Sequence, residues 1–179
     1  MKAKSAFWQE TAKPVVVLLL ICLFSGLILA AVNSVTAPII AANQEAQAQA
    51  TYIALLPEAD SFSELSTTVE GVSNVLQADN GAGYIVVAAA QGYKGDVVAT
   101  VAFDNDGNIL GLSMTADDET VGLGTRVTEE AFTGQFVGKP AENIDYADVN
   151  AVSGATYSSR AAVEAIDLAI QAYQEVRGN

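Results

Sequence analysis

Histidine is absent from this sequence, and cysteine occurs only once, at Cys22. Without histidine, the common catalytic triads, zinc sites and haem sites lose their usual base or ligand. A single cysteine also excludes a disulfide within the chain, and because Cys22 lies inside a long apolar run we expect no thiol active site. Any redox chemistry must therefore use a cofactor that is held by other groups.

Basic residues are scarce. The chain has 8 lysines and arginines against 21 aspartates and glutamates, which gives a formal net charge of −13. Only five basic but 20 acidic residues follow position 13, so this larger part carries a net charge of −15. Such a surface repels nucleic acids and anionic lipid headgroups, and we expect no nucleic-acid partner. The negative charge itself needs no special function, because an ordinary acidic surface outside the cytoplasm is enough to explain it.

One long segment carries no charge at all. From Val15 to Val32 the sequence reads VVVLLLICLFSGLILAAV, and the next charged residue is Glu45. About 20 apolar residues span the hydrocarbon core of a bilayer, so we expect a transmembrane helix over residues 14–35. A cleaved signal peptide is the alternative, but its apolar core is normally only about 7–15 residues long. We interpret the segment as a retained membrane helix.

Positive charge flanks this helix on one side. Lys2, Lys4 and Lys13 precede it, and no basic residue follows before Lys94. Because positively charged flanks stay in the cytoplasm, we expect residues 1–13 to be cytoplasmic. The sequence thus predicts a single-pass protein of the cell (inner) membrane with an extracytoplasmic C-terminal domain.

Residues 36–67 are predicted to connect the membrane helix to that domain. The stretch AANQEAQAQATYIALL, residues 41–56, is rich in good helix formers and stops before Pro57. We interpret it as a juxtamembrane helix. The polar stretch EADSFSELSTTVEG, residues 58–71, is expected to be a weakly structured linker.

The remaining residues, 68–179, are predicted to form an α+β domain. Short apolar runs bounded by glycines predict an antiparallel β meander over residues 83–116, with NDGN at 105–108 as a two-residue hairpin turn. A short helix is expected within VTEEAFTGQFVGK, where two phenylalanines lie four residues apart. A final amphipathic helix is predicted from about Ser158 to Val176, because its apolar residues recur every three or four positions. Strands followed by segregated helices are typical of the α+β class.

The start of this last helix carries more hydroxyls than a helix cap needs. The sequence around it reads NAVSGATYSSR, with four serine and threonine side chains in seven residues. One Ser or Thr is enough to cap a helix, and capping is the commoner role. The unpaired N–H groups and the dipole of a helix N-terminus also favour a phosphate group.

The same stretch resembles the flavinylation motif D-x-x-S/T-G-A-T-x-S/T of the FMN-binding domain family. In that family a flavin transferase links FMN, through its phosphate, to the threonine hydroxyl. The resemblance therefore implies covalent FMN on Thr156, with Ser153, Gly154 and Ala155 shaping the turn. Asn150 stands where the family usually has aspartate.

A second loop, DDETVGLGTR at residues 117–126, resembles the H-x-E-T-P-G-L-G loop in G subunits of Rnf ion-translocating electron-transport complexes. Asp117 and Val121 stand where that family commonly has histidine and proline. A weaker similarity is GYKGD at 92–96, which is otherwise explained as a hairpin corner. By resemblance, the matching loop positions are flavin-binding candidates: Glu119, Thr120, Gly122, Leu123 and Gly124.

Similarity to Rnf G subunits covers the membrane helix, the juxtamembrane segment and residues 83–174. It implies an electron relay through FMN, within a complex that couples electron flow between ferredoxin and NAD to Na⁺ or H⁺ movement. The implied partners are the other membrane subunits, one of which carries covalent FMN, and a flavin transferase for maturation. Such a relay needs no catalytic acid–base residue and no metal site.

FMN adds negative charge to an already acidic domain. Three of the few basic residues lie beside the predicted site segments: Arg126, Lys139 and Arg160. We hypothesise that they converge on the flavin and stabilise its reduced, anionic form.

Two other functions fit the same residues. One is a stand-alone membrane flavoprotein that passes electrons to an extracytoplasmic acceptor. The other is a scaffold module in which SGAT only caps a helix and the protein is colourless.

Overall fold

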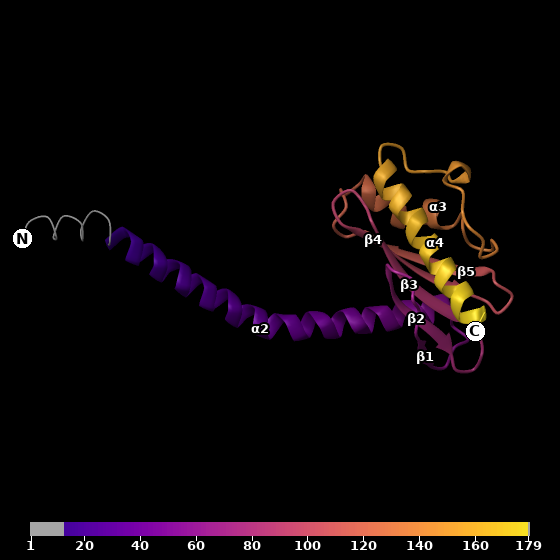
Figure 1. Cartoon of the computed structure of the whole chain (residues 1–179), viewed down its shortest axis with the longest axis horizontal. Coiled ribbons are helices and arrows are strands. Elements are labelled where there is room, and N and C mark those ends of the chain that lie inside the picture. The colour runs from indigo at the N-terminus through magenta and orange to yellow at the C-terminus, as the bar shows by residue number, and fades with distance from the viewer. Residues whose placement is uncertain (1–12, 179) are drawn as a thin grey trace, which may run out of the picture. The chain divides into compact units, whose positions relative to one another are not determined.

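The computed structural model describes residues 13–178 and divides into two compact units that meet between Ala48 and Gln49 (Figure 1). Helix α2, Lys13–Leu55, supplies the described part of the first unit and the beginning of the second. None of its residues is buried, and it is long and apolar enough to cross a membrane. The cytoplasmic segment that we predicted falls almost wholly on residues 1–12, which lie outside the described residues.

Helix α2 contains Pro38 and continues through it. Proline removes one backbone hydrogen bond from a helix. Immediately before it, the hydroxyl of Ser34 donates to the carbonyl of Ala31 (2.8 Å) and that of Thr36 to the carbonyl of Val32 (3.0 Å). The helix ends at Leu55, two residues before Pro57, so the predicted helicity of residues 41–55 is confirmed.

A five-stranded antiparallel sheet forms the centre of the second unit, and its strands are adjacent in chain order. The predicted meander over residues 83–116 is confirmed as the last three of these strands. The strands are β1 (Phe62–Leu65), β2 (Val72–Ala78), β3 (Tyr84–Gln91), β4 (Asp96–Phe103) and β5 (Ile109–Thr115).

Strand β1 corrects the prediction of a weakly structured linker over residues 58–71. Its four residues pair with β2, from Phe62 opposite Ala78 to Leu65 opposite Val75. The ring of Phe62 also packs edge-to-face on Tyr52, with 6.1 Å between the ring centroids. A short polar segment becomes a strand here because a neighbouring strand and a helix supply its partners.

The β4–β5 connection is longer than the two-residue turn that we predicted. Within residues 104–108 only Gly107 has a positive φ (+92°), whereas the predicted turn needs positive φ at both central residues. Instead, the Asp104 carboxylate accepts hydrogen bonds from the backbone and the side chain of Asn108, at 2.7 and 2.8 Å. These bonds close a five-residue loop over residues 104–108.

The segment after β5 is less helical than predicted. It contains a 3₁₀ helix, η2 (Gly124–Thr128), and one helical turn, α3 (Glu130–Thr133). Phe132 and Phe136 are both buried, and their ring centroids lie 5.5 Å apart. The phenylalanine pair therefore contacts as predicted, although the helix ends at Thr133, before Gly134. A further 3₁₀ turn, η3 (Tyr146–Asp148), lies in the segment that leads to the last helix.

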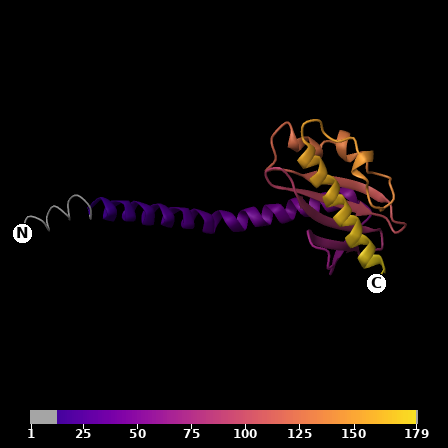
Figure 2. The ribbon, with the colours of Figure 1, turned by 45° about the horizontal axis from the view of Figure 1, so that its top comes forward.

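Helix α4, Thr156–Gly178, lies across one face of the sheet (Figure 2). It begins two residues before the predicted start. Small side chains allow it to approach β3 and β4 closely, because five of its alanines are buried: Ala161, Ala162, Ala165, Ala169 and Ala172. The opposite face of the sheet carries a smaller cluster that includes Leu56 and Ile85. The N-terminus of α4 is thereby fixed at the end of the sheet where β3 turns into β4.

Candidate functional site

The turn before α4 separates the four serine and threonine side chains into two kinds. Ser159 is fully buried and its Oγ accepts a hydrogen bond from the backbone N–H of Val152 (3.0 Å). Ser158 is also buried and donates to Glu119 (2.7 Å). Ser153 and Thr156 are exposed, and within residues 13–178 the Thr156 hydroxyl has no hydrogen-bond partner. Of the three serine and threonine hydroxyls in the first turn of the helix, that of Thr156 is the one free to react.

The backbone at this turn leaves three N–H groups without an intrahelical partner. The first backbone bond of α4 runs from the N–H of Ser159 to the carbonyl of Ala155 (2.9 Å). The three preceding N–H groups, those of residues 156–158, therefore lie in the first turn, where no intrahelical partner exists. Gly154 has φ +82°, which permits the sharp entry into the helix. The turn thus presents a hydroxyl beside amides suited to an anion.

The second predicted loop forms its own tight turn. The N–H groups of Leu123 and Thr125 both donate to the carbonyl of Thr120, at 3.0 and 3.3 Å. Gly122 has φ +75° and donates to the hydroxyl of Thr125 (3.0 Å). Leu123 is left 39% exposed at the tip. The loop therefore offers an apolar side chain on a fixed backbone.

Glu119 lies beneath both loops and is only 3% exposed. Its carboxylate accepts hydrogen bonds from the N–H groups of Tyr93 (2.6 Å) and Lys94 (3.0 Å) and from the hydroxyl of Ser158 (2.7 Å). Burial alone would raise the pKa of Glu119. The hydrogen bonds from Lys94, Ser158, Tyr93 and Gly95 outweigh that effect and hold its pKa below the ordinary value, so the residue is anionic at neutral pH.

These segments enclose a cleft of about 280 Å³. It combines both predicted motifs with residues that the sequence did not single out. Of those, the rings of Tyr93 and Tyr157 lie 6.2 Å apart at an angle of 39°, and both are largely exposed. The lining residues are Tyr93, Glu119, Thr120, Leu123, Gly124, Gly154, Ala155, Thr156, Tyr157 and Ser158.

Several predicted site residues do not line this cleft. Gly122 and Ser153 belong to its two loops but are absent from its wall. Arg126 pairs with Glu129, at 3.6 Å between nitrogen and oxygen, and the ammonium of Lys139 lies 5.8 Å from the ring centre of Phe136. Arg160 contacts the ring of Tyr146, away from the cleft. The three basic side chains are therefore not gathered at the cleft wall.

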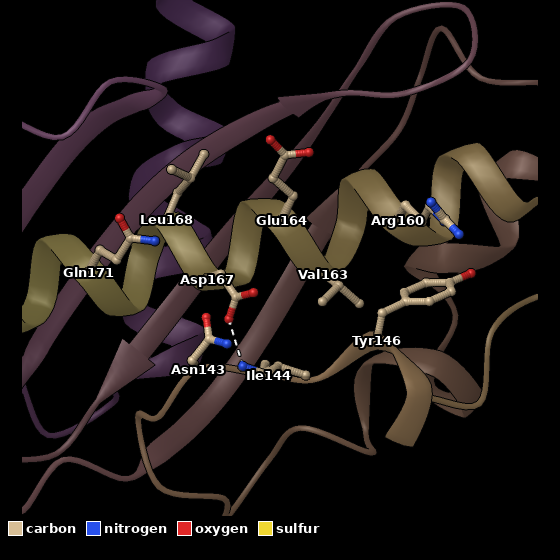
Figure 3. Close-up of a pocket in the computed structure, with 9 residues that line it drawn as sticks. All are labelled: Asn143, Ile144, Tyr146, Arg160, Val163, Glu164, Asp167, Leu168 and Gln171. Carbon is tan, nitrogen blue, oxygen red and sulfur yellow. Dashed lines mark hydrogen bonds between the residues drawn. The ribbon is translucent and has the colours of Figure 1, made fainter.

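Arg160 belongs to a second, more open hollow of about 470 Å³ between α4 and residues 143–146 (Figure 3). Its guanidinium carbon lies 5.2 Å from the ring centre of Tyr146. In Figure 3 Asp167 points toward the loop, where it accepts a hydrogen bond from the N–H of Ile144 (2.9 Å). Although larger, this hollow contains none of the residues in either flavin-like motif.

The Asp167 carboxylate in this hollow is poorly compensated. Burial, and to a lesser degree repulsion from Glu164, raise the pKa of Asp167 above its ordinary value despite the bond from Ile144. We expect Asp167→Asn to raise the melting temperature by about 1–3 °C at pH 7, because the amide oxygen still accepts that bond. This gain in melting temperature should shrink as the pH falls through the raised pKa of Asp167, because the wild-type carboxyl then becomes neutral and no longer carries a poorly compensated charge. A pH series of thermal melts measures it, and a variant that melts lower than the wild type at pH 7 would contradict this prediction.

Comparison with known proteins gives consistent matches for both parts of the chain. Residues 92–171 match the FMN-binding domain family and residues 1–54 match the RnfG N-terminal region. The chain is 31% identical to the G subunit of the proton-translocating ferredoxin:NAD(+) oxidoreductase complex of Clostridium ljungdahlii, over 84% of each chain. It is 26% identical to the G subunit of the Na(+)-translocating ferredoxin:NAD(+) oxidoreductase complex of Acetobacterium woodii, over 94% of each.

A solved structure supports the fold of the second unit. The C subunit of the Na(+)-translocating NADH-quinone reductase of Parabacteroides distasonis matches with a TM-score of 0.50 and 22% sequence identity. The match covers 60% of this chain and 62% of that one. The α+β fold predicted from the sequence is thus confirmed by the strands and helix seen here and by this neighbour.

Proposed function

Because this chain belongs to the G-subunit family of Rnf-type oxidoreductase complexes and carries their FMN-binding domain, we propose that it relays electrons through FMN attached to Thr156. The proposed setting is a ferredoxin:NAD oxidoreductase coupled to Na⁺ or H⁺ translocation. One observation supports this most directly. The two motifs, some 30 residues apart in the sequence, line one cleft with the exposed hydroxyl of Thr156, which has no hydrogen-bond partner within residues 13–178.

The cleft suits the parts of FMN. Thr156 would hold FMN through an ester between its Oγ1 and the FMN phosphate; in forming it, the threonine would lose its hydroxyl proton and the phosphorus would lose its bond to the leaving group of the donor, which would take up that proton. The N–H groups of the first helical turn and the helix dipole stabilise the phosphate charge without a lysine. Leu123, Tyr93 and Tyr157 offer apolar and aromatic surface for a flat ring.

The size of the cleft also fits a relay. At about 280 Å³ it lies just below the usual range for ligand sites, so part of a bound flavin stays accessible to a neighbouring protein of the complex. When bound, FMN supplies electron transfer in single-electron steps. The chain itself only holds and orients the cofactor, which explains why a protein without histidine can serve.

Membrane attachment is part of the proposal. In this proposal helix α2 provides the span, residues 14–35, and the lysines before that span favour a cytoplasmic N-terminus. The flavin domain, proposed as residues 68–179 with residues 36–67 as the connection, then lies outside. Covalent attachment suits that location, because a lost FMN is not readily replaced there.

Purification of the tagged chain from its native membrane tests this function. We expect other membrane subunits of the complex to co-purify, together with ferredoxin:NAD oxidoreductase activity. A yellow chain that purifies alone would favour the stand-alone flavoprotein. A colourless chain, from cells that contain a flavin transferase, would favour the scaffold module.

Arg126 and Lys139 are expected to affect the midpoint potential of the bound flavin to different degrees. Arg126 follows the cleft-lining Gly124 by two positions, whereas Lys139 lies against Phe136. Removal of a nearby positive charge makes reduction of the flavin less favourable. The midpoint potential should therefore become more negative in Arg126→Ala than in Lys139→Ala. Unchanged potentials in both variants would show that neither residue acts on the flavin.

A further inference from the structure

Three segments that are distant in the sequence meet at one buried carboxylate, that of Glu119. They are the 92–95 turn between β3 and β4, the loop over residues 119–124, and the first turn of α4. Each contributes a residue to the cleft wall: Tyr93, Leu123 and Thr156. Glu119 is the only side chain among residues 13–178 that is hydrogen-bonded to both the 92–95 turn and α4.

The contacts of this carboxylate divide between its two oxygens. Oε1 accepts from the N–H groups of Tyr93 and Lys94, which fixes the turn that carries the Tyr93 ring. Oε2 accepts from the hydroxyl of Ser158, two residues after Thr156 in α4. Glu119 itself begins the loop that presents Leu123. All three walls of the cleft are therefore held by one group.

Two glycines make room for that group. A Cβ atom added to Gly92 would collide with Oε1 of Glu119, and one added to Gly124 would collide with Oε2. Both glycines have ordinary φ values, so backbone conformation does not require them. A side chain at either position would instead crowd the Glu119 carboxylate, and one at Gly92 would also meet the carbonyl of Gly95. Gly92 of GYKGD and Gly124 of VGLG thus both leave space for Glu119.

We propose that Glu119 is a positioning residue, which aligns the Thr156 hydroxyl with the ring-binding surface of Tyr93 and Leu123. The inference rests on the proposed function of this cleft. Glu119 is buried, and its oxygens are occupied by the protein's own donors, so it acts through its neighbours. This role differs from the direct flavin contact suggested by its place in the loop motif.

The charge of Glu119 adds a second effect. An anionic carboxylate beneath the cleft disfavours further negative charge on a nearby group. Its replacement by a neutral group of the same shape is therefore expected to raise the midpoint potential of the bound flavin. If Glu119 acted only through its hydrogen bonds to the turn and to Ser158, that potential would stay unchanged.

Four versions of the full chain, made in cells that contain a flavin transferase, test the proposal: the wild type and three variants. Glu119→Ala removes the tie, whereas in Glu119→Gln the amide oxygen still accepts from the turn and the amide N–H₂ can donate to Ser158. Glu175→Ala is the matched control, because that carboxylate also accepts several hydrogen bonds, from Thr67 and Thr68, but near the other end of α4. The readout is the rate of flavin incorporation, followed by fluorescence on denaturing gels.

We expect incorporation into Glu119→Ala to fall at least about tenfold, because small misalignments of reacting groups cost one to two orders of magnitude. Glu119→Gln and Glu175→Ala should stay within about twofold of the wild type by the same reasoning. The flavin of Glu119→Gln should show a more positive potential. Wild-type incorporation into Glu119→Ala, or an equal loss in Glu175→Ala, would overturn the proposal.

A measurement without flavin separates this inference from the proposed function. In a Thr156→Ala background, amide hydrogen exchange at Tyr93 and Lys94 should be faster once Glu119 is also alanine, while exchange in β3 and β4 stays slow. Unchanged exchange at both amides would overturn the positioning role. If the wild-type chain takes up no flavin, the proposed function fails, and this exchange result still decides whether Glu119 orders the cleft.

Discussion

A chain carrying Thr156→Ala is expected to contain no covalent flavin, and a complex built with it to lose nearly all ferredoxin:NAD oxidoreductase activity. Thr156 is exposed at the first position of α4 and its hydroxyl makes no hydrogen bond within residues 13–178, so its removal costs the fold little. A loss of activity with an unchanged melting temperature therefore points to the attachment itself. Fluorescence of the denatured chain and the activity of the purified complex measure the two effects.

Two neighbouring substitutions sharpen this prediction. Thr156→Ser keeps a hydroxyl at the same helical position and should retain covalent flavin, at least in part. Ser153→Ala removes the other exposed serine or threonine hydroxyl of the turn, which lies outside the cleft wall, and should be flavinylated normally. Covalent flavin on Thr156→Ala, or its loss in Ser153→Ala, would show that the acceptor has been misassigned.

The largest effect on stability is expected at Tyr173, on the buried face of α4. Its ring is 1% exposed and stacks on Phe103, with 4.5 Å between the centroids, and it meets Tyr84 edge-to-face at 5.4 Å. Its hydroxyl donates to the backbone carbonyl of Asp104 (2.9 Å). Truncation to alanine removes both the ring packing and this link to the β4–β5 loop.

We expect Tyr173→Ala to lower the free energy of unfolding by about 3–5 kcal/mol, as for other large aromatic truncations in a core. For a domain of this size that corresponds to a drop in melting temperature of about 10 °C or more. Tyr173→Phe keeps the ring and should cost only about 1 kcal/mol, for the lost hydrogen bond. Thermal unfolding followed by near-ultraviolet circular dichroism compares them, and equal losses in the two variants would refute the assignment of the stability to ring packing.

The sequence predicted those elements whose residues repeat regularly. The apolar stripe of α4 and the glycine-bounded runs of β3, β4 and β5 carry their structure in local spacing, and the predictions were confirmed. Strand β1 was missed because it is short and polar and depends on β2 and Tyr52 for its partners. The helix expected around Phe132 is reduced to one turn that ends at Thr133, before Gly134.

The candidate site was predictable only in part. Its two main loops, Ser158 included, were found from their motifs. The contacts of Glu119 with Tyr93 and with Ser158 were not, because no local pattern connects residues 26 and 39 positions apart. The short GYKGD similarity was the only signal for Tyr93. For the basic side chains the sequence predicted a contact that the structure does not show. Lys139 and Arg160 lie close to the motifs in sequence, which suggested that they converge on the flavin, yet they contact the rings of Phe136 and Tyr146.

The relatives do not decide which ion, Na⁺ or H⁺, is coupled to electron flow. One is named for proton translocation and another for Na⁺ translocation, at 31% and 26% identity. The proposed task of the flavin domain is to hold a redox group, and that task does not require it to bind the ion. The ion is therefore expected to be selected in the other membrane proteins of the complex.

Intact mass spectrometry of the chain from its native membrane, followed by mapping of the peptide that contains Thr156, shows directly whether this threonine carries flavin. We expect a mass gain of one FMN minus one water, located on Thr156. A bare mass, from cells with an active flavin transferase, would contradict it and leave Thr156 as the first residue of a helix and nothing more.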